Sequence, residues 1–396
     1  MFQDLNINIK ILENNDENIL KCAHKIENNE LVIFPTENVF QIGCNCFSTN
    51  AIKNIYKIKN KIHNQPLTLN VLDYEMAQNF IQPNNFEKKI IEKLVSLFWP
   101  GPLTFILKNK SKKLNDLLQT KNDSKQNEDQ FNNLYITCPE NKSIRTIIEK
   151  TYTPLFTSSA NPYGKIPSVT HSHVLKYFEK ENITLLKGSH YPKYCFENTI
   201  LSICNNNFES NKCVLIVEQR GLITIEMLKN SLSDFEIEII DREDLNKIQK
   251  NKLNFNNDKN KKEDDNFGSN LGSKKLDKKI ILFNFMESSH IKLGDFQENI
   301  IQSVNNYLQN SALVDFNSLN FKHRNKFGAY VDLSEKGDIK EAIFNFYNVI
   351  HQLIECKEIQ NILIYNYYEE KSELHTSLSN KINNFSNFSK TIIPLF

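Results

Sequence analysis

The feature that most constrains the fold is an alternation of short apolar runs with longer segments of helical periodicity. Apolar residues recur every three or four positions in the helical segments, which predicts helices at 49–59, 86–98, 142–150, 171–179 and 224–231. The apolar runs predict strands at 30–35, 66–72, 103–107, 134–137, 155–158, 183–186, 199–203 and 214–217. The polar stretch 109–132 is expected to be a surface loop. This order favours an α/β or α+β domain built on a twisted mixed sheet.

The alternation stops once, at residues 243–278, which are rich in Lys, Asn, Asp, Gly and Ser. Such a segment buries too little apolar area to order itself, so we expect a disordered linker there. It would separate a domain at 1–242 from a domain at 279–396. The second domain has expected strands at 279–283, 312–316, 330–333 and 362–365, and helices at 295–308, 337–355 and 371–384. A smaller βαβ (Rossmann-like) domain with a parallel sheet is predicted.

Composition excludes several classes of protein. The formal net charge of +1 argues against a chain that seeks polyanions over its whole surface. The eight cysteines form no CxxC pair, so we expect no metal site and a reducing, cytoplasmic location. If Cys44 and Cys46 lie on a strand, both side chains should point to the same face, into the protein core. No apolar window approaches the length of a membrane span, and the first residues lack a secretion signal.

Two short motifs about a hundred residues apart carry the chemistry. Lys59-Asn60-Lys61 places two cations where they can face one phosphate, and Ser159-Ala160-Asn161 offers hydrogen bonds to its oxygens or to a sugar. No Walker A loop and no GxGxxG are present, so a nucleotide would be bound by side-chain cations and hydroxyls. The alternative is that the lysines satisfy a helix C-terminus and the second motif is a polar turn.

The motifs stand in an ordered series of blocks that resembles the YrdC/Sua5 family of threonylcarbamoyl-AMP synthases, in particular its long Sua5-type members. The resemblance covers roughly residues 20–230, and a weaker one extends to the C-terminal domain. The blocks are Pro35-Thr36-Glu37-Asn38-Val39, Lys59-Asn60-Lys61, Gln65-Pro66-Leu67, Trp99-Pro100-Gly101-Pro102-Leu103-Thr104, Ser159-Ala160-Asn161, Glu197-Asn198-Thr199 and Arg220-Gly221.

The resemblance implies synthesis of threonylcarbamoyl-AMP from L-threonine, bicarbonate and ATP with Mg2+, as the first step of the t6A modification of tRNA. By the same resemblance, tRNA and the t6A transferase complex are expected partners. Lys59 and Lys61 would act on the phosphates as the catalytic cations. The nucleotide would also contact His63, Thr104, Ser159, Asn161 and Arg220, and threonine would contact Thr36, Asn70, Thr137 and Thr199.

The chain departs from the family pattern at several of these places. Lysine replaces arginine at Lys61, and neutral side chains replace arginine at Thr137 and Gln219. The other departures are Phe40 for tyrosine, Gln41 and Cys195 for glycine, Asn70 for histidine and Asn198 for serine.

The departures leave two alternatives open. One is a weakly catalytic family member that binds RNA or nucleotide through a Lys57, Lys59 and Lys61 stripe. The other is a different carbamoyl- or acyl-adenylate transferase, which threonine dependence would distinguish from a threonylcarbamoyl-AMP synthase.

Overall fold

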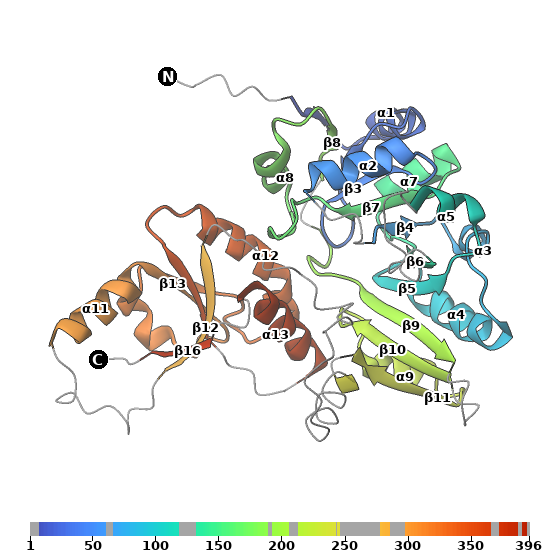
Figure 1. Cartoon of the computed structure of the whole chain (residues 1–396). Coiled ribbons are helices and arrows are strands. Elements are labelled where there is room, and N and C mark those ends of the chain that lie inside the picture. Colours follow the sequence, from blue (N-terminus) through green and yellow to red (C-terminus); the bar gives the residue numbers. More distant parts are fainter. Residues whose placement is uncertain are drawn as a thin grey trace, which may run out of the picture. The chain divides into compact units, whose positions relative to one another are not determined.

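The computed structural model describes residues 8–60, 66–118, 132–188, 192–205, 213–242, 244–245, 278–285, 298–365, 372–386 and 390–393. The chain forms two compact units, shown in Figure 1: Met1–Tyr163 with Pro167–Asn270, and Gly164–Ile166 with Leu271–Phe396. Almost all of the predicted linker 243–278, together with Lys61 and His63, lies outside the described residues. Within the described ranges, no helix is both long and apolar enough to cross a membrane.

The first unit is built on one mixed sheet with the order β1-β8-β2-β3-β7-β4-β6-β5-β9-β10-β11. Five neighbouring pairs are parallel (β1 with β8, β2 with β8, β4 with β6, β5 with β9, β10 with β11), and the other five are antiparallel. The strands are β1 (Lys10–Leu12), β2 (Val32–Phe34), β3 (Gln41–Asn45), β4 (Thr68–Asn70), β5 (Leu103–Lys108), β6 (Asn133–Thr137), β7 (Leu155–Ser159), β8 (Thr184–Leu186), β9 (Thr199–Asn205), β10 (Cys213–Gln219) and β11 (Ile237–Asp241).

Helices cover this sheet unequally on its two faces. They are α1 (Asp16–Glu27), α2 (Thr49–Ile58), α3 (Tyr74–Gln78), α4 (Asn85–Phe98), α5 (Lys112–Leu118), α7 (Lys142–Thr151), α8 (His171–Phe178) and α9 (Ile225–Ser231). The larger apolar core includes α2 and α4, whose buried residues pack with Ile33, Ile42, Cys44 and Cys46. Because side chains alternate along a strand, Val32 and Phe34 face the other side, where they pack with α1 and α7.

Beyond α1 and α7, that second face carries polar side chains. Cross-strand pairing aligns Gly43 with Thr157, Thr157 with Thr68, Asn70 with Thr137, and Thr137 with Thr104. Residues paired in this way point to the same side of a sheet. The polar residues therefore form one surface across β7, β4, β6 and β5.

The second unit has a parallel sheet of order β14-β13-β15-β12-β16. Its elements are β12 (Lys279–Phe285), α11 (Glu298–Gln309), β13 (Ser311–Asp315), the 3-10 helix η4 (Phe321–Lys326), β14 (Ala329–Asp332), α12 (Ile339–Glu355), β15 (Asn361–Tyr365), α13 (Glu373–Ser386) and β16 (Lys390–Ile393). The predicted parallel βαβ architecture is confirmed, with one further strand, β16.

The predicted helices and strands of the first unit are present, with their ends shifted by a few residues. The expectation of an unbroken loop at 109–132 was wrong, because α5 occupies Lys112–Leu118 and buries Leu114 completely. Residues 119–131 lie outside the described part of the chain. Cys44 and Cys46 are both buried, as predicted. Strands β1, β3 and β11 and helices α1 and α3 were not predicted from the sequence.

Candidate nucleotide and substrate site

The side chain of Lys59 joins the two motifs in space. Ser48 caps the N-terminus of α2, and Lys59 is its C-cap residue. Only 3% of Lys59 is exposed. Its Nζ donates to the carbonyl oxygen of Asn161 over 2.6 Å and also to that of Ser159. The backbone of Lys59 accepts a bond from Tyr163 N. A buried cation thus fixes the turn that follows β7.

Residues 35–40, between β2 and β3, are named here the crossing loop. Thr36 shapes it, since its Oγ1 donates to Val39 O over 2.7 Å and accepts from Asn38 N. At its far end, Phe40 O accepts from Ala160 N over 2.7 Å. Asn38 Nδ2 donates to Asn198 Oδ1, 160 positions later in the chain. The crossing loop therefore connects the Lys59 turn with the start of β9.

Glu37 anchors the middle of the crossing loop. Its Oε2 accepts from Asn141 N over 3.1 Å, at the N-cap of α7, and its backbone oxygen accepts from Tyr194 N over 2.8 Å. Glu37 is only 5% exposed, and this burial raises the pKa of its carboxyl above the usual value of 4.5.

The raised pKa of Glu37 predicts a pH-dependent stability difference. An acid with a raised pKa in the folded state contributes stability that is complete below its unfolded pKa and is lost as pH rises through its folded pKa. We therefore expect Glu37→Gln to become more stable relative to wild type as pH increases from about 4.5 to 8. Melting temperatures of both proteins across this range test it. Glu149→Gln, at an exposed position of α7, is the control, and a constant Glu37→Gln difference would contradict the prediction.

Asn198, directly before β9, is the centre of a neutral polar cluster. Its Nδ2 donates to Thr104 Oγ1 over 2.9 Å and to Thr137 Oγ1 over 3.2 Å. Its backbone oxygen accepts from Gln219 Nε2 over 3.0 Å. Asn198 thus links Asn38, Thr137 and Gln219 to Thr104. Of these residues, Thr137, Asn198 and Gln219 depart from the family pattern, and Asn38 had no role assigned from the sequence.

The turn between α4 and β5 holds Thr104 in place. Trp99 Nε1 donates to Leu103 O over 2.8 Å, and its ring packs edge-on against Phe105. Gly101 N donates to Cys138 O over 2.9 Å, which ties this turn to the end of β6. The Trp-Pro-Gly-Pro block thus sets the register that brings Thr104 beside Thr137.

Asn70 lies on the same face, at the end of β4. Its Nδ2 donates to Thr157 Oγ1 over 2.6 Å and to Thr68 O over 3.2 Å. Asn70 is 1% exposed, and its Oδ1 has no hydrogen-bond partner among the described residues. The same holds for Asn38 Oδ1 and Gln41 Oε1 within the described ranges. Buried acceptors without donors are costly, so these oxygens indicate a surface that a donor group could complete.

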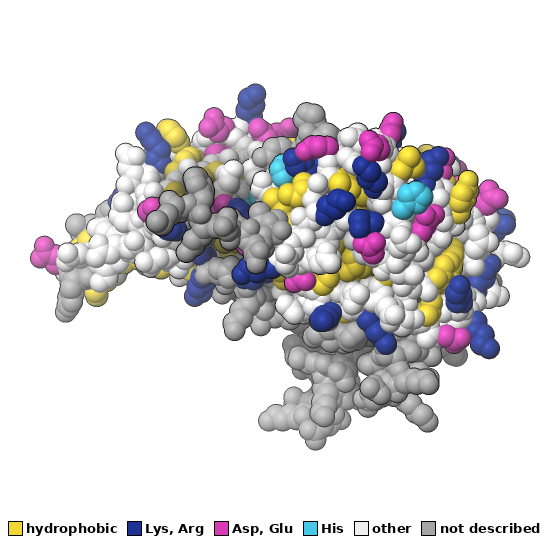
Figure 2. All heavy atoms as spheres, turned by 90° about the horizontal axis from the view of Figure 1, so that it is seen from above, with side chains coloured by type: hydrophobic (Ala, Val, Ile, Leu, Met, Phe, Trp, Pro, Cys, Tyr) yellow, Lys and Arg dark blue, Asp and Glu magenta, His cyan; other side chains and the backbone are white. Residues whose placement is uncertain are grey.

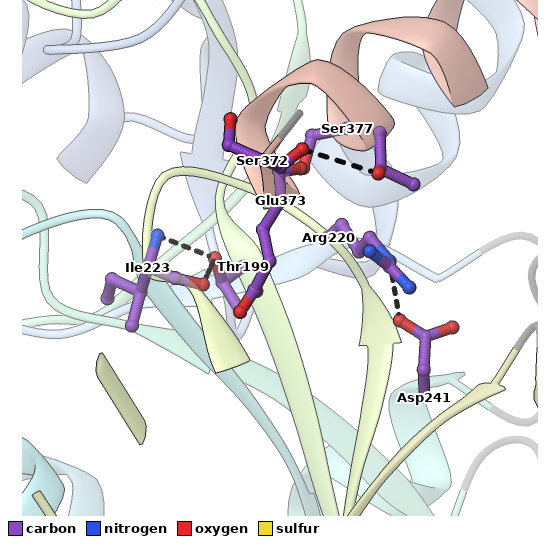
Figure 3. Close-up of polar contacts among 8 residues, drawn as sticks. Thr199, Arg220, Ile223, Asp241, Ser372, Glu373 and Ser377 are labelled. Atoms are coloured by element: carbon purple, nitrogen blue, oxygen red, sulfur yellow. Dashed lines mark hydrogen bonds and ion pairs between the residues drawn. The ribbon is translucent and has the colours of Figure 1, made fainter. Parts of the chain in front are cut away.

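Thr199 and Arg220 make structural contacts within the first unit, as Figure 3 shows. Thr199 Oγ1 donates to Ile223 O over 2.9 Å and accepts from Ile223 N over 3.0 Å. Arg220 Nε lies 2.7 Å from Asp241 Oδ2, and that aspartate is nearly completely buried. The Nε of Arg220 is therefore paired with a carboxylate of β11, and the phosphate contact expected of this side chain stays a prediction.

Removal of the Thr199 hydroxyl should reduce stability. In Thr199→Val, both backbone groups of Ile223 would lose a buried partner, which we expect to lower the free energy of unfolding by about 1–3 kcal/mol. Chemical denaturation measures this loss. Thr391→Val, the same change at an exposed strand position of the second unit, should be nearly neutral. A Thr199→Val protein as stable as the control would refute the structural role.

The structure brings some predicted residues together and leaves others apart. Lys59 contacts the turn of Ser159 and Asn161, and Thr104 lies beside Thr137. Asn70 lies next to Thr137 on β4, the strand adjacent to β6. Thr36 shapes the crossing loop from within. Asn38 stands in the Pro35-Thr36-Glu37-Asn38-Val39 block but was given no role from the sequence. Its place in a short polar turn between two apolar runs, next to Glu37, was the available signal.

The proposed RNA-binding stripe of Lys57, Lys59 and Lys61 loses one member, since Lys59 is buried. Tyr56 and Phe40, the aromatic residues near it, are also buried and cannot stack on bases from outside. Figure 2 shows a face on which basic and acidic side chains are interspersed. These observations count against the RNA alternative.

Comparison with known proteins places the chain in a family. The family profile described as "Telomere recombination", which covers Sua5, YciO and YrdC, matches residues 24–212. A putative threonylcarbamoyl-AMP synthase of Methanocaldococcus jannaschii is 31% identical over 225 residues, which are 56% of this chain and 95% of that protein. The chain therefore belongs to the Sua5/YciO/YrdC family.

Other relatives match over a smaller share of their length. The threonylcarbamoyl-AMP synthase of Bacillus subtilis is 29% identical over 163 residues, which are 41% of this chain and 44% of that protein. Among solved structures, P. abyssi Sua5 complexed with L-threonine matches with a TM-score of 0.71 and 19% sequence identity. The match covers 98% of this chain and 99% of the P. abyssi chain. This likeness shows that the fold is that of Sua5, including the second unit.

Proposed function

We propose that this chain is a threonylcarbamoyl-AMP synthase that uses L-threonine, bicarbonate and ATP and releases pyrophosphate. The observation that carries the proposal is the contact of buried Lys59 with the carbonyls of Ser159 and Asn161, which unites the two motifs of the nucleotide site. The family membership and the names of the relatives support the same reaction.

The chemistry requires positioning more than a covalent nucleophile. The amine of threonine adds to bicarbonate-derived CO2 and gives a carbamate. A carbamate oxygen then attacks the α-phosphorus of ATP, and the bond to the pyrophosphate leaving group breaks. Both reactants are anionic, so cations and hydrogen-bond donors that hold them together supply most of the rate enhancement. Lys59 and Lys61 are the proposed cations.

We assign the polar surface next to the crossing loop to threonine. Asn70 and Thr137 lie there, and Asn70 Oδ1, which has no partner among the described residues, suits an amine or hydroxyl donor. The described residues contain no group of three His, Cys, Asp or Glu side chains that could hold a metal ion. In the proposed reaction, Mg2+ would be bound by the phosphates of ATP, whose charge it would partly neutralise.

The proposal places the reaction at the start of t6A synthesis, with tRNA and the t6A transferase complex as later partners in the cytoplasm. The test is pyrophosphate release by the purified chain with ATP, Mg2+ and bicarbonate, with and without L-threonine. Threonine-dependent release of pyrophosphate, with threonylcarbamoyl-AMP detected by mass spectrometry, is the expected result. ATP binding without release would contradict the synthase assignment, and release with another amino acid would indicate a different adenylate-forming transferase.

A further inference from the structure

The backbone of Asn198 is held from three sides. Thr199 N donates to Pro102 O over 3.0 Å, and Gln219 Nε2 donates to Asn198 O over 3.0 Å. A Cβ built on Gly221 would lie 2.5 Å from the carbonyl carbon of Asn198, so the turn at Gly221 presses directly on this residue. The side chain of Asn198 consequently projects from a fixed point onto the polar face.

The hydrogen bonds around Asn198 determine which way its amide points. Thr137 Oγ1 donates its one proton to Leu103 O over 2.8 Å, so it can only accept from Asn198. The atom of Asn198 that faces Thr137 must therefore be the NH2 group. The opposite atom is the oxygen that accepts from Asn38 Nδ2. Both ends of the amide are thus assigned by their partners.

The amide orientation in turn sets the direction of the Thr104 hydroxyl. Thr104 Oγ1 accepts from the same NH2 group over 2.9 Å, and it makes no other hydrogen bond within the described part of the chain. Its proton must point elsewhere. Because Thr104 is only 3% exposed, an unpaired hydroxyl proton there carries a desolvation cost that a ligand acceptor would remove.

We infer that Asn198 is a positioning residue that turns the Thr104 hydroxyl outward, as a donor to an anionic oxygen of the bound substrates. The inference rests on the proposed synthase reaction, which offers two such oxygens: one on threonine or its carbamate, and one on the α-phosphate of ATP. A neutral amide network thereby provides an oriented hydrogen-bond donor in a region where Thr137 and Gln219 replace the arginines of the family pattern.

The isosteric variant Asn198→Asp tests this inference directly. A carboxylate at this position has no N–H to donate and would accept the Thr104 proton itself, which turns the hydroxyl away from the substrate. We expect kcat/KM to fall about 10- to 100-fold, the range expected for loss of a hydrogen bond to a charged group. A rise in KM confined to threonine would assign the acceptor to threonine, and a rise confined to ATP would assign it to the phosphate.

Three further variants separate positioning from other effects. In Thr104→Val, Asn198→Asp should cause almost no additional loss, because the hydroxyl it acts through is absent. Asn198→Ser keeps one donor and should retain more activity than Asn198→Asp. Asn15→Asp makes the same charge change at the exposed N-cap of α1, where aspartate caps equally well, and should behave as wild type.

Two results would overturn the inference: an Asn198→Asp enzyme within about threefold of wild type, or an equal loss from Asn198→Asp with and without the Thr104 hydroxyl, which would indicate charge repulsion. Lack of turnover in the wild-type chain would instead refute the proposed function. The affinities of wild type, Asn198→Asp and Thr104→Val for ATP and for threonine, measured by calorimetry, would then decide the inference on the same criteria.

Discussion

Lys59→Met is expected to abolish most of the activity. The substitution keeps the apolar stem but removes a buried cation and leaves the carbonyls of Ser159 and Asn161 without their donor. Loss of one preorganised electrostatic contact typically costs about 100- to 1000-fold in kcat. The two unsatisfied carbonyls should also lower the free energy of unfolding by about 1–3 kcal/mol. Initial rates of threonine-dependent pyrophosphate release measure the first effect, and thermal denaturation measures the second.

Lys57→Met is the matched control, because Lys57 lies on the same helix end but is exposed. It should match wild type in both measurements. If the Lys59→Met enzyme retained more than about a tenth of the wild-type rate, the proposed electrostatic role of Lys59 would be wrong. A loss of stability with normal kcat and KM would leave Lys59 with a purely structural role.

Gly221→Ala is expected to be the most destabilising small substitution in the first unit. The added Cβ would lie 2.4 Å from Thr199 N, 2.5 Å from the Asn198 carbonyl carbon and 2.7 Å from Glu197 O. All three are backbone atoms of one strand entry, so no side-chain rotation can relieve the overlap. We expect a loss of about 3 kcal/mol, which corresponds to a melting temperature lower by roughly 6–12 °C.

Gly43→Ala provides a graded comparison. Its Cβ would lie 2.7 Å from Phe34 Cζ and 3.2 Å from Thr157 Cγ2, which are side-chain atoms. Because a ring can shift where a backbone cannot, Gly43→Ala should cost less than Gly221→Ala. The opposite order of melting temperatures would show that the Gly221 turn is more compliant than its contacts indicate.

Local patterns sufficed to predict most elements of both units. The Ser48 cap and the apolar period of α2 identify that helix, and Asn84 caps α4 with a capping box in the same way. The polar stretch after β5 concealed α5 because, among the side chains described there, Leu114 and Leu117 alone pack against the apolar core.

The assembly of the site was beyond local patterns. The Asn38 to Asn198 bond joins residues 160 positions apart, and nothing in either neighbourhood specifies the other. The ion pair of Arg220 with Asp241 was likewise not predicted, because Asp241 lies in β11, a strand that the local patterns did not reveal. Long-range pairing of this kind depends on the order of strands in the sheet, and neither the hydrophobic periodicity of the sequence nor its composition encodes that order.

The interleaved strand order has a consequence for the nascent chain on the ribosome. Strand β5 pairs with β9, which begins 91 residues after β5 ends at Lys108, so that edge of the sheet has no partner until Thr199 has been synthesised. An open edge exposes backbone groups that invite pairing with other chains. Thr104, at the start of β5, likewise has its hydrogen-bond donor only after Asn198 has been synthesised. The site therefore matures late in translation, and truncated chains ending between 108 and 199 should be prone to aggregation.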